Sequence, residues 1–180
     1  MRVLITYGSK RGGTAGIAHQ LAHTLQEQGL EVEVLPASEA GSPEEYDAVI
    51  VGGALYARRW HRDARRFVER HAELLSTLPV WLFSSGPLDD SAAHGELPAV
   101  PQVRRLLARI QAQGHITFGG RLQPDASGFI ARWMARTRAG DWRDPRLIRA
   151  WGEGIGEALH LFEQGPAPGP VWESSGPAAH

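Results

Sequence analysis

The chain reads RVLITYGSKRGGT at positions 2–14, where a run of β-prone apolar residues leads directly into a glycine-rich turn. Residues 2–7 have the nearly continuous apolar character of a strand that is buried on both faces. A helical pattern follows, in which Ile17, Leu21 and Leu25 recur every four residues, and Gly29 stands where helices commonly end. This strand, turn and helix predict the first unit of an α/β fold.

The same alternation of strand and helix continues to about residue 162. Further strands are predicted at residues 31–35, 47–53, 79–85 and 115–122. Further helices are predicted at residues 61–78, 103–110 and 145–162. Gly114 is expected to close the second of these helices. The first of these strands alternates between polar and apolar residues, which is typical of a sheet edge. Right-handed crossovers and five parallel strands favour the order 2-1-3-4-5, with ligands bound beyond the carboxyl ends of the strands.

The composition of the 180 residues limits the possible functions. Hydrophobic residues make up 42% and charged residues 22%, so we expect one globular domain at 1–163, followed by a disordered Gly/Pro-rich tail at 164–180. The lack of cysteine excludes disulfides, thiolate metal sites, iron–sulfur clusters and cysteine nucleophiles. A net charge of -1 argues against a nucleic-acid-binding protein. Because no apolar run approaches the roughly 20 residues of a membrane span and the start does not resemble a signal peptide, we expect a cytoplasmic protein.

The turn after the first strand can hold a phosphate. A glycine-rich connection between a buried strand and a helix presents unpaired backbone N–H groups, and the helix dipole favours an anion there. Gly12 and Gly13 allow the backbone to approach a ligand closely, and Ser9 and Thr14 supply hydroxyl groups. The alternative is that Thr14 only caps the helix and the glycines only turn the chain. The turn is neither GxGxxG nor a P-loop, which disfavours dinucleotides and nucleoside triphosphates.

This turn resembles the phosphate loop of flavodoxins, in which hydroxyl-bearing residues, a glycine and a threonine hold the phosphate of FMN. Ser9, Gly12 and Thr14 match that pattern, whereas Arg11 stands where flavodoxins carry a second hydroxyl. The flavodoxin-type, menaquinone-dependent protoporphyrinogen IX dehydrogenases are similar here, with a basic residue beside the first hydroxyl and no second one. The resemblance to that family covers about residues 1–162 and includes the segments at 46–56, 60–61, 66–71, 79–88 and 140–144.

The resemblance implies a flavodoxin-like three-layer sandwich with FMN at the carboxyl ends of the strands. An isoalloxazine ring needs flat apolar walls, for which Tyr56 and Trp60 are candidates, and the small Ala54 lets the backbone come close. The alternative is that Trp60 packs on a helix and Tyr56 covers the end of the sheet. The candidate FMN-binding residues are Ser9, Lys10, Arg11, Gly12, Gly13, Thr14, Ala54, Leu55, Tyr56, Trp60, Ser84, Ser85, Gly86 and Pro87.

No side chain stands out as catalytic. Asp89 and Asp90 follow the fourth strand, but adjacent acids in a turn are more typical of a solvated loop. His19 and His23 have a spacing that can bind a metal, yet they lie away from the apolar stripe of their helix and have no evident third ligand. We therefore expect no metal site. Residues 84–86 lack the Gly-x-Ser-x-Gly pattern of serine hydrolases.

Two segments concentrate the basic residues, nearly all of which are arginine. Residues 58–70 contain six arginines against two acids, and residues 121–149 contain seven against three, a local charge of +4 in each. Basic segments with interleaved aromatic residues can bind an anionic ligand or an anionic membrane surface. The alternative is that arginine only covers solvated helix faces. We expect a redox partner or a quinone, and keep open an anionic substrate or a peripheral contact at the inner face of the membrane.

Three functions are compatible with these residues. The resemblance implies an FMN-dependent oxidoreductase that oxidises protoporphyrinogen IX or a related reduced substrate, with a quinone as acceptor and the flavin supplying the redox chemistry. The second is a flavodoxin-type electron carrier, although such carriers are usually acidic around the flavin and this rim is expected to be rich in arginine. The third is a flavin-free domain with a binding or regulatory role, which the replacement of a hydroxyl by Arg11 would favour.

Overall fold

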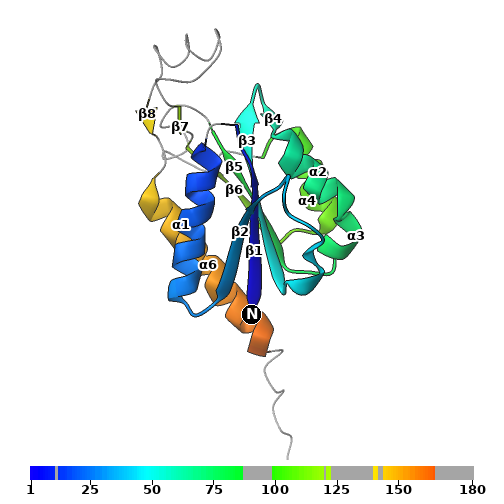
Figure 1. The fold of residues 1–180 in the computed structure, drawn as a ribbon, viewed down its shortest axis with the longest axis vertical. Coiled ribbons are helices and arrows are strands. Elements are labelled where there is room, and N and C mark those ends of the chain that lie inside the picture. Colours follow the sequence, from blue (N-terminus) through cyan, green and yellow to red (C-terminus); the bar gives the residue numbers. More distant parts are fainter. Residues whose placement is uncertain (11, 87–98, 120, 123–139, 142–143, 165–180) are drawn as a thin grey trace, which may run out of the picture.

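The centre of the protein is a parallel sheet with the strand order β2-β1-β3-β5-β6 (Figure 1). Its strands are β1 (Arg2–Gly8), β2 (Glu31–Pro36), β3 (Ala48–Tyr56), β5 (Val80–Ser85) and β6 (Gly114–Phe118). All four neighbouring pairs along this path run parallel. Numbered as successive parallel strands, this is the order 2-1-3-4-5, so the predicted fold is confirmed. The structure is a computed structural model, which describes residues 1–10, 12–86, 99–119, 121–122, 140–141 and 144–164.

Helices cover both faces of this sheet, as Figure 1 shows. The helices are α1 (Gly13–Glu27), α2 (Arg62–Arg70), α3 (Ala72–Leu75), α4 (Pro101–Ile110), α6 (Pro145–Gln164) and the 3-10 turn η1 (Pro43–Glu45). Helices α1 and α6 pack on one face, in a core that contains Ile50 and Phe83. Helices α2, α3 and α4 pack on the other face, in a core that contains Val51 and Leu82. Because successive side chains of β3 and β5 enter opposite cores, both strands are buried along nearly their whole length.

Several boundaries differ from those expected. The helix predicted at 61–78 is interrupted at His71, which ends α2 and precedes α3. Helix α4 does not extend to Gly114, because Gln111 adopts the left-handed conformation with φ 50° and Gly114 already begins β6. The segment predicted as strand 115–122 is divided, since β7 (Arg121–Leu122) pairs with β8 (Gly140–Asp141) in a separate small sheet. Gln164, expected in the tail, is the last residue of α6.

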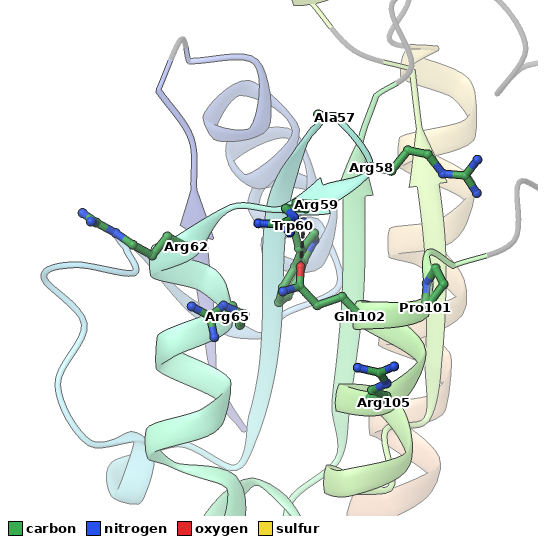
Figure 2. Close-up of a pocket in the computed structure, with 9 residues that line it drawn as sticks. All are labelled: Ala57, Arg58, Arg59, Trp60, Arg62, Arg65, Pro101, Gln102 and Arg105. Carbon is green, nitrogen blue, oxygen red and sulfur yellow. Dashed lines mark hydrogen bonds between the residues drawn. The ribbon is translucent and has the colours of Figure 1, made fainter.

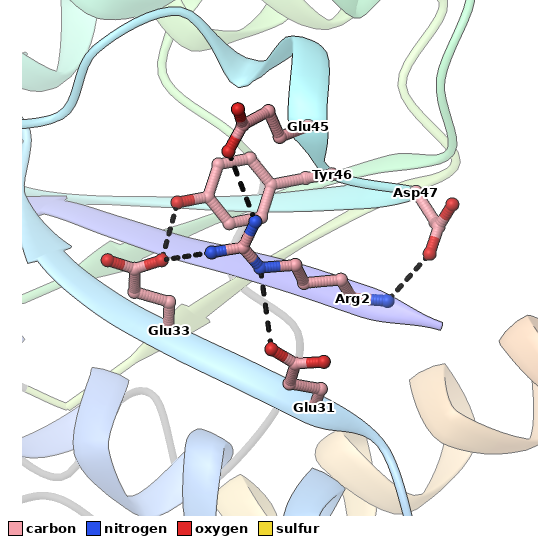
Figure 3. A network of polar contacts seen from close by, with 6 residues as sticks. All are labelled: Arg2, Glu31, Glu33, Glu45, Tyr46 and Asp47. Atoms are coloured by element: carbon pink, nitrogen blue, oxygen red, sulfur yellow. Dashed lines mark hydrogen bonds and ion pairs between the residues drawn. The ribbon is translucent and has the colours of Figure 1, made fainter.

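A network around Arg2 joins the strands at the amino end of the sheet (Figure 3). The guanidinium lies within ion-pair distance of three carboxylates, and the backbone N–H of Arg2 donates to a fourth. These acids are Glu31, Glu33, Glu45 and Asp47. The hydroxyl of Tyr46 donates to Glu33 over 2.7 Å, and burial together with that carboxylate raises the pKa of Tyr46 to about 12. The network therefore places a dense group of acids at the end of the sheet opposite to the carboxyl ends of the strands.

Candidate functional site

The turn between β1 and α1 has the features of an anion site. Gly12 is the N-cap of α1 with φ 75°, and neither a side-chain cap nor an acidic residue occupies the first turn of this 15-residue helix. A Cβ added to Gly12 would meet no atom within 4 Å, so the outer side of the turn is open. The first backbone N–H groups of a helix have no intrahelical partner, and the helix dipole favours negative charge beside them. Lys10 is exposed on the same turn. These residues fit a phosphate group.

Thr14 is fully buried and bonds across the fold instead of capping its helix. Its Oγ1 lies 2.7 Å from Oγ of Ser85 at the end of β5, and both side chains are buried. The alternative in which Thr14 is the N-cap is therefore wrong, because Gly12 holds that position. The bond ties the turn after β1 to the end of β5, two predicted parts of one site that are 71 residues apart in the sequence.

The loops after β3 and β5 lie side by side. A Cβ added to Gly86 would be 3.4 Å from Cβ of Leu55, and the N–H of Gly86 donates to the carbonyl of Phe118 over 2.9 Å. Ala54, which is buried, is paired with Ser85 in the sheet. Tyr56 is half-buried at the end of β3, with its ring edge-on to His61 at 6.3 Å between centroids. The structure thus brings Ala54, Leu55, Tyr56, Ser85 and Gly86 together at one end of the sheet.

Beyond Tyr56 the chain turns back in a tight hairpin to β4 (Arg59–Trp60), which runs antiparallel to β3. The two residues of the turn, Ala57 and Arg58, have φ values of 48° and 60°. Positive φ at both central positions is the geometry of a type I′ turn, which glycine or asparagine adopts with little strain. Alanine and arginine pay a steric penalty there, so this hairpin holds backbone strain beside the candidate site.

We expect Ala57→Gly to stabilise the protein by about 1 kcal/mol, because it removes the Cβ from a left-handed residue. Urea unfolding of the variant and the native chain measures this difference. As a control, Ala54→Gly makes the same change in the buried part of β3. There it should destabilise the protein, because a buried methyl group is lost and the unfolded chain gains conformational entropy. A stability of Ala57→Gly at or below that of the native chain would contradict the strain assigned to this turn.

Trp60 lies in the core and does not present an open face. Only 3% of its surface is exposed, and a Cβ added to Gly53 would overlap its indole ring. It belongs to the cluster that packs under α2, α3 and α4. Among the described residues, its Nε1 has no hydrogen-bond partner although it is buried. The position of Trp60 thus matches the alternative of packing beneath a helix, and its role as a flavin wall stays a prediction.

His61 is a residue of this site that sequence reasoning did not assign. Its side chain is 8% exposed, and a Cβ added to Gly8 would lie 2.6 Å from its Nδ1, so the imidazole packs against the end of β1. Burial lowers the pKa of His61, against the opposing effect of Asp63, and the nearby Lys10 lowers it further. The imidazole is therefore neutral near pH 7. Since Nδ1 accepts from the N–H of Asp63, the proton lies on Nε2, which is buried without a described partner.

Ser84 points to the opposite face of the sheet from Ser85. Its Oγ lies 3.0 Å from Nε2 of His115 on β6, and the side chain is 1% exposed. Burial lowers the pKa of His115 to about 4, so the imidazole is neutral at physiological pH. Only the backbone of Ser84 is therefore placed to take part in the predicted site.

Some expected features lie outside the described residues, namely Arg11, Pro87, Asp89, Asp90 and most of the segment 121–149. Ser9 is partly buried on the turn after β1, and Gly13 is buried in the first turn of α1. In the ranges that the structure describes, no group of three or more histidine or acidic side chains could hold a metal. None of the helices in these ranges is long and apolar enough to span a bilayer.

Comparison with known proteins identifies the family of this chain. The flavodoxin domain family matches residues 4–139, which is most of the chain. This chain is a member of that family. The match confirms the family expected from the sequence, and with it FMN as the cofactor. As a flavodoxin domain, the protein has a redox role.

Individual relatives and solved structures match this chain over different shares of their own length. Protoporphyrinogen IX dehydrogenase [quinone] of Escherichia coli (strain K12) is 31% identical over 86 residues, which are 47% of this chain and 48% of that protein. The match thus spans about half the length of that relative. Flavodoxin 1 from Bacillus cereus aligns with a TM-score of 0.58 at 18% identity, over 89% of this chain and 99% of that one. The rubredoxin oxygen:oxidoreductase of Desulfovibrio gigas aligns with a TM-score of 0.61 at 13% identity, over 88% of this chain and 36% of that one.

Proposed function

We propose that this flavodoxin domain is an FMN-dependent oxidoreductase that takes electrons from a reduced anionic substrate, protoporphyrinogen IX or a relative of it, and passes them to a quinone. The observation that carries this proposal is the charge of the hairpin after β3. Arg58 and Arg59 stand directly beyond Tyr56, where the ring of FMN is expected, and both are exposed. An arginine-rich rim suits a substrate with carboxylate groups better than it suits a basic reductase. The partial match to a quinone-linked dehydrogenase also supports the proposal.

The phosphate of FMN is proposed to lie on the turn of residues 9–14, against the uncapped N-terminus of α1. In this proposal the ring lies between the loops after β3 and β5, with Tyr56 as one wall and the backbone of Ala54, Ser85 and Gly86 along its edge. The bound flavin supplies the electron transfer. The chain's own residues orient the ring, exclude water from it and present arginine to the substrate. Each quinone that is reduced to a quinol takes up the electron pair and the protons that the substrate loses.

The test is anaerobic oxidation of protoporphyrinogen IX by the FMN-loaded chain, followed by the fluorescence of the protoporphyrin that forms. We expect turnover when a soluble quinone is added and none without it. Tyr56→Leu should weaken FMN binding about tenfold, because a stacking wall is lost. Tyr46→Leu is the matched control, since it makes the same change at the amino end of the sheet and should leave FMN affinity unchanged.

The results of this experiment distinguish the proposed oxidoreductase from a flavodoxin-type electron carrier. A chain that retains FMN, does not oxidise the substrate with any quinone, and accepts electrons rapidly from a ferredoxin-type reductase would be a carrier. A colourless chain that does not bind added FMN would contradict both functions.

A further inference from the structure

A pocket of about 910 Å³ lies between α2 and α4, next to the hairpin that follows β3 (Figure 2). Figure 2 shows Arg65 on α2 and Arg105 on α4 on either side of the space between the two helices, with Arg59 and Trp60 toward the hairpin. Five arginines from three parts of the chain line the pocket: Arg58, Arg59, Arg62, Arg65 and Arg105. The fold therefore brings Arg105 next to arginines of the basic segment 58–70, from which it is distant in the sequence.

Among the described residues, acidic side chains neutralise only part of the positive charge of this pocket. Arg65 pairs with Glu69 at 3.1 Å, and Arg62 lies 3.5 Å from Asp63. Within the described ranges, no carboxylate lies in ion-pair distance of Arg58, Arg59 or Arg105. Like charges held close together oppose folding unless an anion offsets them. A cluster of this kind can bind a ligand that supplies the opposite charge.

The surrounding backbone and a polar side chain also favour a negatively charged ligand. Helix α4 begins at Pro101, at the pocket, with no side-chain cap and no acidic residue in its first turn. Its dipole adds to the attraction for an anion at this end. The side-chain oxygen of Gln102 accepts a hydrogen bond from the backbone N–H of Trp60 over 2.9 Å. The amide NH₂ of Gln102 is thereby left as a further donor at the pocket wall.

This pocket is distinct from the proposed phosphate site of FMN. The turn of residues 9–14 leads into α1, which packs on the face of the sheet that α6 also covers. The pocket is built on α2 and α4, which pack on the opposite face. Both sites lie toward the carboxyl ends of the strands, and the hairpin after β3 forms part of the pocket wall.

We infer that the pocket between α2 and α4 binds a compact ligand with at least two phosphate or carboxylate groups, held by guanidinium groups from both helices and the hairpin. Guanidinium groups bind phosphate and carboxylate alike, through two parallel N–H···O bonds. The pocket volume is in the range of small-molecule sites, and its walls come from separate elements. Arg58 and Arg59 belong both to this pocket and to the rim proposed for the substrate, so the test uses variants of the helix arginines alone.

The experiment measures binding of inorganic pyrophosphate and of citrate to the full chain saturated with FMN, by isothermal titration calorimetry at low salt and constant ionic strength. We expect one of these probes to bind saturably with a stoichiometry of one, and to raise the melting temperature. The double variant Arg65→Gln/Arg105→Gln should weaken that binding about tenfold or more, since it removes guanidinium groups from both walls. Bound FMN, read from its absorbance, should be unaffected in this variant.

The matched control is Arg104→Gln, an exposed arginine on α4 that does not line the pocket. It removes one positive charge from the helix that also carries Arg105, and it should leave probe binding nearly unchanged. Equal weakening by Arg104→Gln would show a general effect of surface charge and overturn the site. Absence of saturable binding by both probes would overturn it as well, as would binding to phosphatidylglycerol vesicles without binding of either probe. If a probe binds while protoporphyrinogen IX is not oxidised, the site stands and only the proposed reaction fails.

Discussion

Gly53→Ala should lower the free energy of unfolding by about 3 kcal/mol and reduce the retention of FMN. Gly53 lies in β3 between Gly8 of β1 and Ser84 of β5, so its backbone is fixed on both sides. A Cβ at this position would overlap the indole of Trp60, which is itself enclosed in the core. Relief requires movement of Trp60, and Trp60 belongs to the short strand that closes the hairpin after β3. The substitution should therefore disturb the core and the candidate flavin loop together.

Urea unfolding and the ratio of flavin absorbance to protein absorbance after purification measure the two effects. Gly154→Ala is the matched control, because a Cβ at Gly154 would meet no atom within 4 Å and the residue lies in the exposed part of α6. In a helix interior that change should stabilise by up to about 1 kcal/mol. A Gly53→Ala protein with native stability and a full content of FMN would contradict the close packing described for Trp60.

Acidification from pH 7 to pH 5 should destabilise the protein, and His115 should account for much of the loss. Burial lowers the pKa of His115 to about 4, whereas the unfolded chain protonates histidine near its ordinary value of about 6.5. Between these two values the unfolded state binds the proton and the folded state does not. The contribution of His115 to the free energy of unfolding is thus complete above pH 6.5. It falls by on the order of 2 to 3 kcal/mol as the pH drops toward 4. His61 and His71, whose pKa values burial also lowers, act with the same sign.

The measurement is the free energy of unfolding in urea at several pH values between 7.5 and 4.5. His115→Gln should flatten the dependence, because glutamine does not titrate in this range and can still hydrogen bond to Ser84. His19→Gln changes an exposed histidine on α1 and should leave the steepness as it is in the native chain. An identical pH dependence in the native chain and in His115→Gln would rule out His115 as the group responsible.

The sequence was sufficient to predict the fold because local patterns agreed with each other. The apolar runs at 2–7, 47–53 and 79–85 became β1, β3 and β5, and the alternating segment at 31–35 became the edge strand β2. Topological rules then left one favoured strand order, which the structure has. The family, and FMN with it, followed from residues that lie near one another in sequence, such as those of the turn at 9–14. The assignment of individual residues to FMN stays a prediction.

Long-range contacts were the part that the sequence did not reveal. Thr14 stands at a position typical of a helix cap, and its bond to Ser85 depends on how β1 and β5 end in space. Trp60 follows a glycine-containing strand, but only packing shows that its ring occupies the space that Gly53 leaves. Arg105 is distant in sequence from Arg65, and the two meet at one pocket because α2 and α4 pack together. Local propensity carries no information on such pairs.

The two ends of the central sheet carry clusters of opposite charge, and their separation contributes an electric dipole moment along the strands. Four carboxylates gather around Arg2 at the amino end, while five arginines line the pocket at the carboxyl end. At roughly 3.3 Å per residue, the nine residues of β3 span about 30 Å between the two ends of the sheet. A negatively charged molecule or surface would exert a torque on such a dipole and turn the flavin end toward itself before contact. Encounters would then be faster than random collision allows, and added salt would slow them.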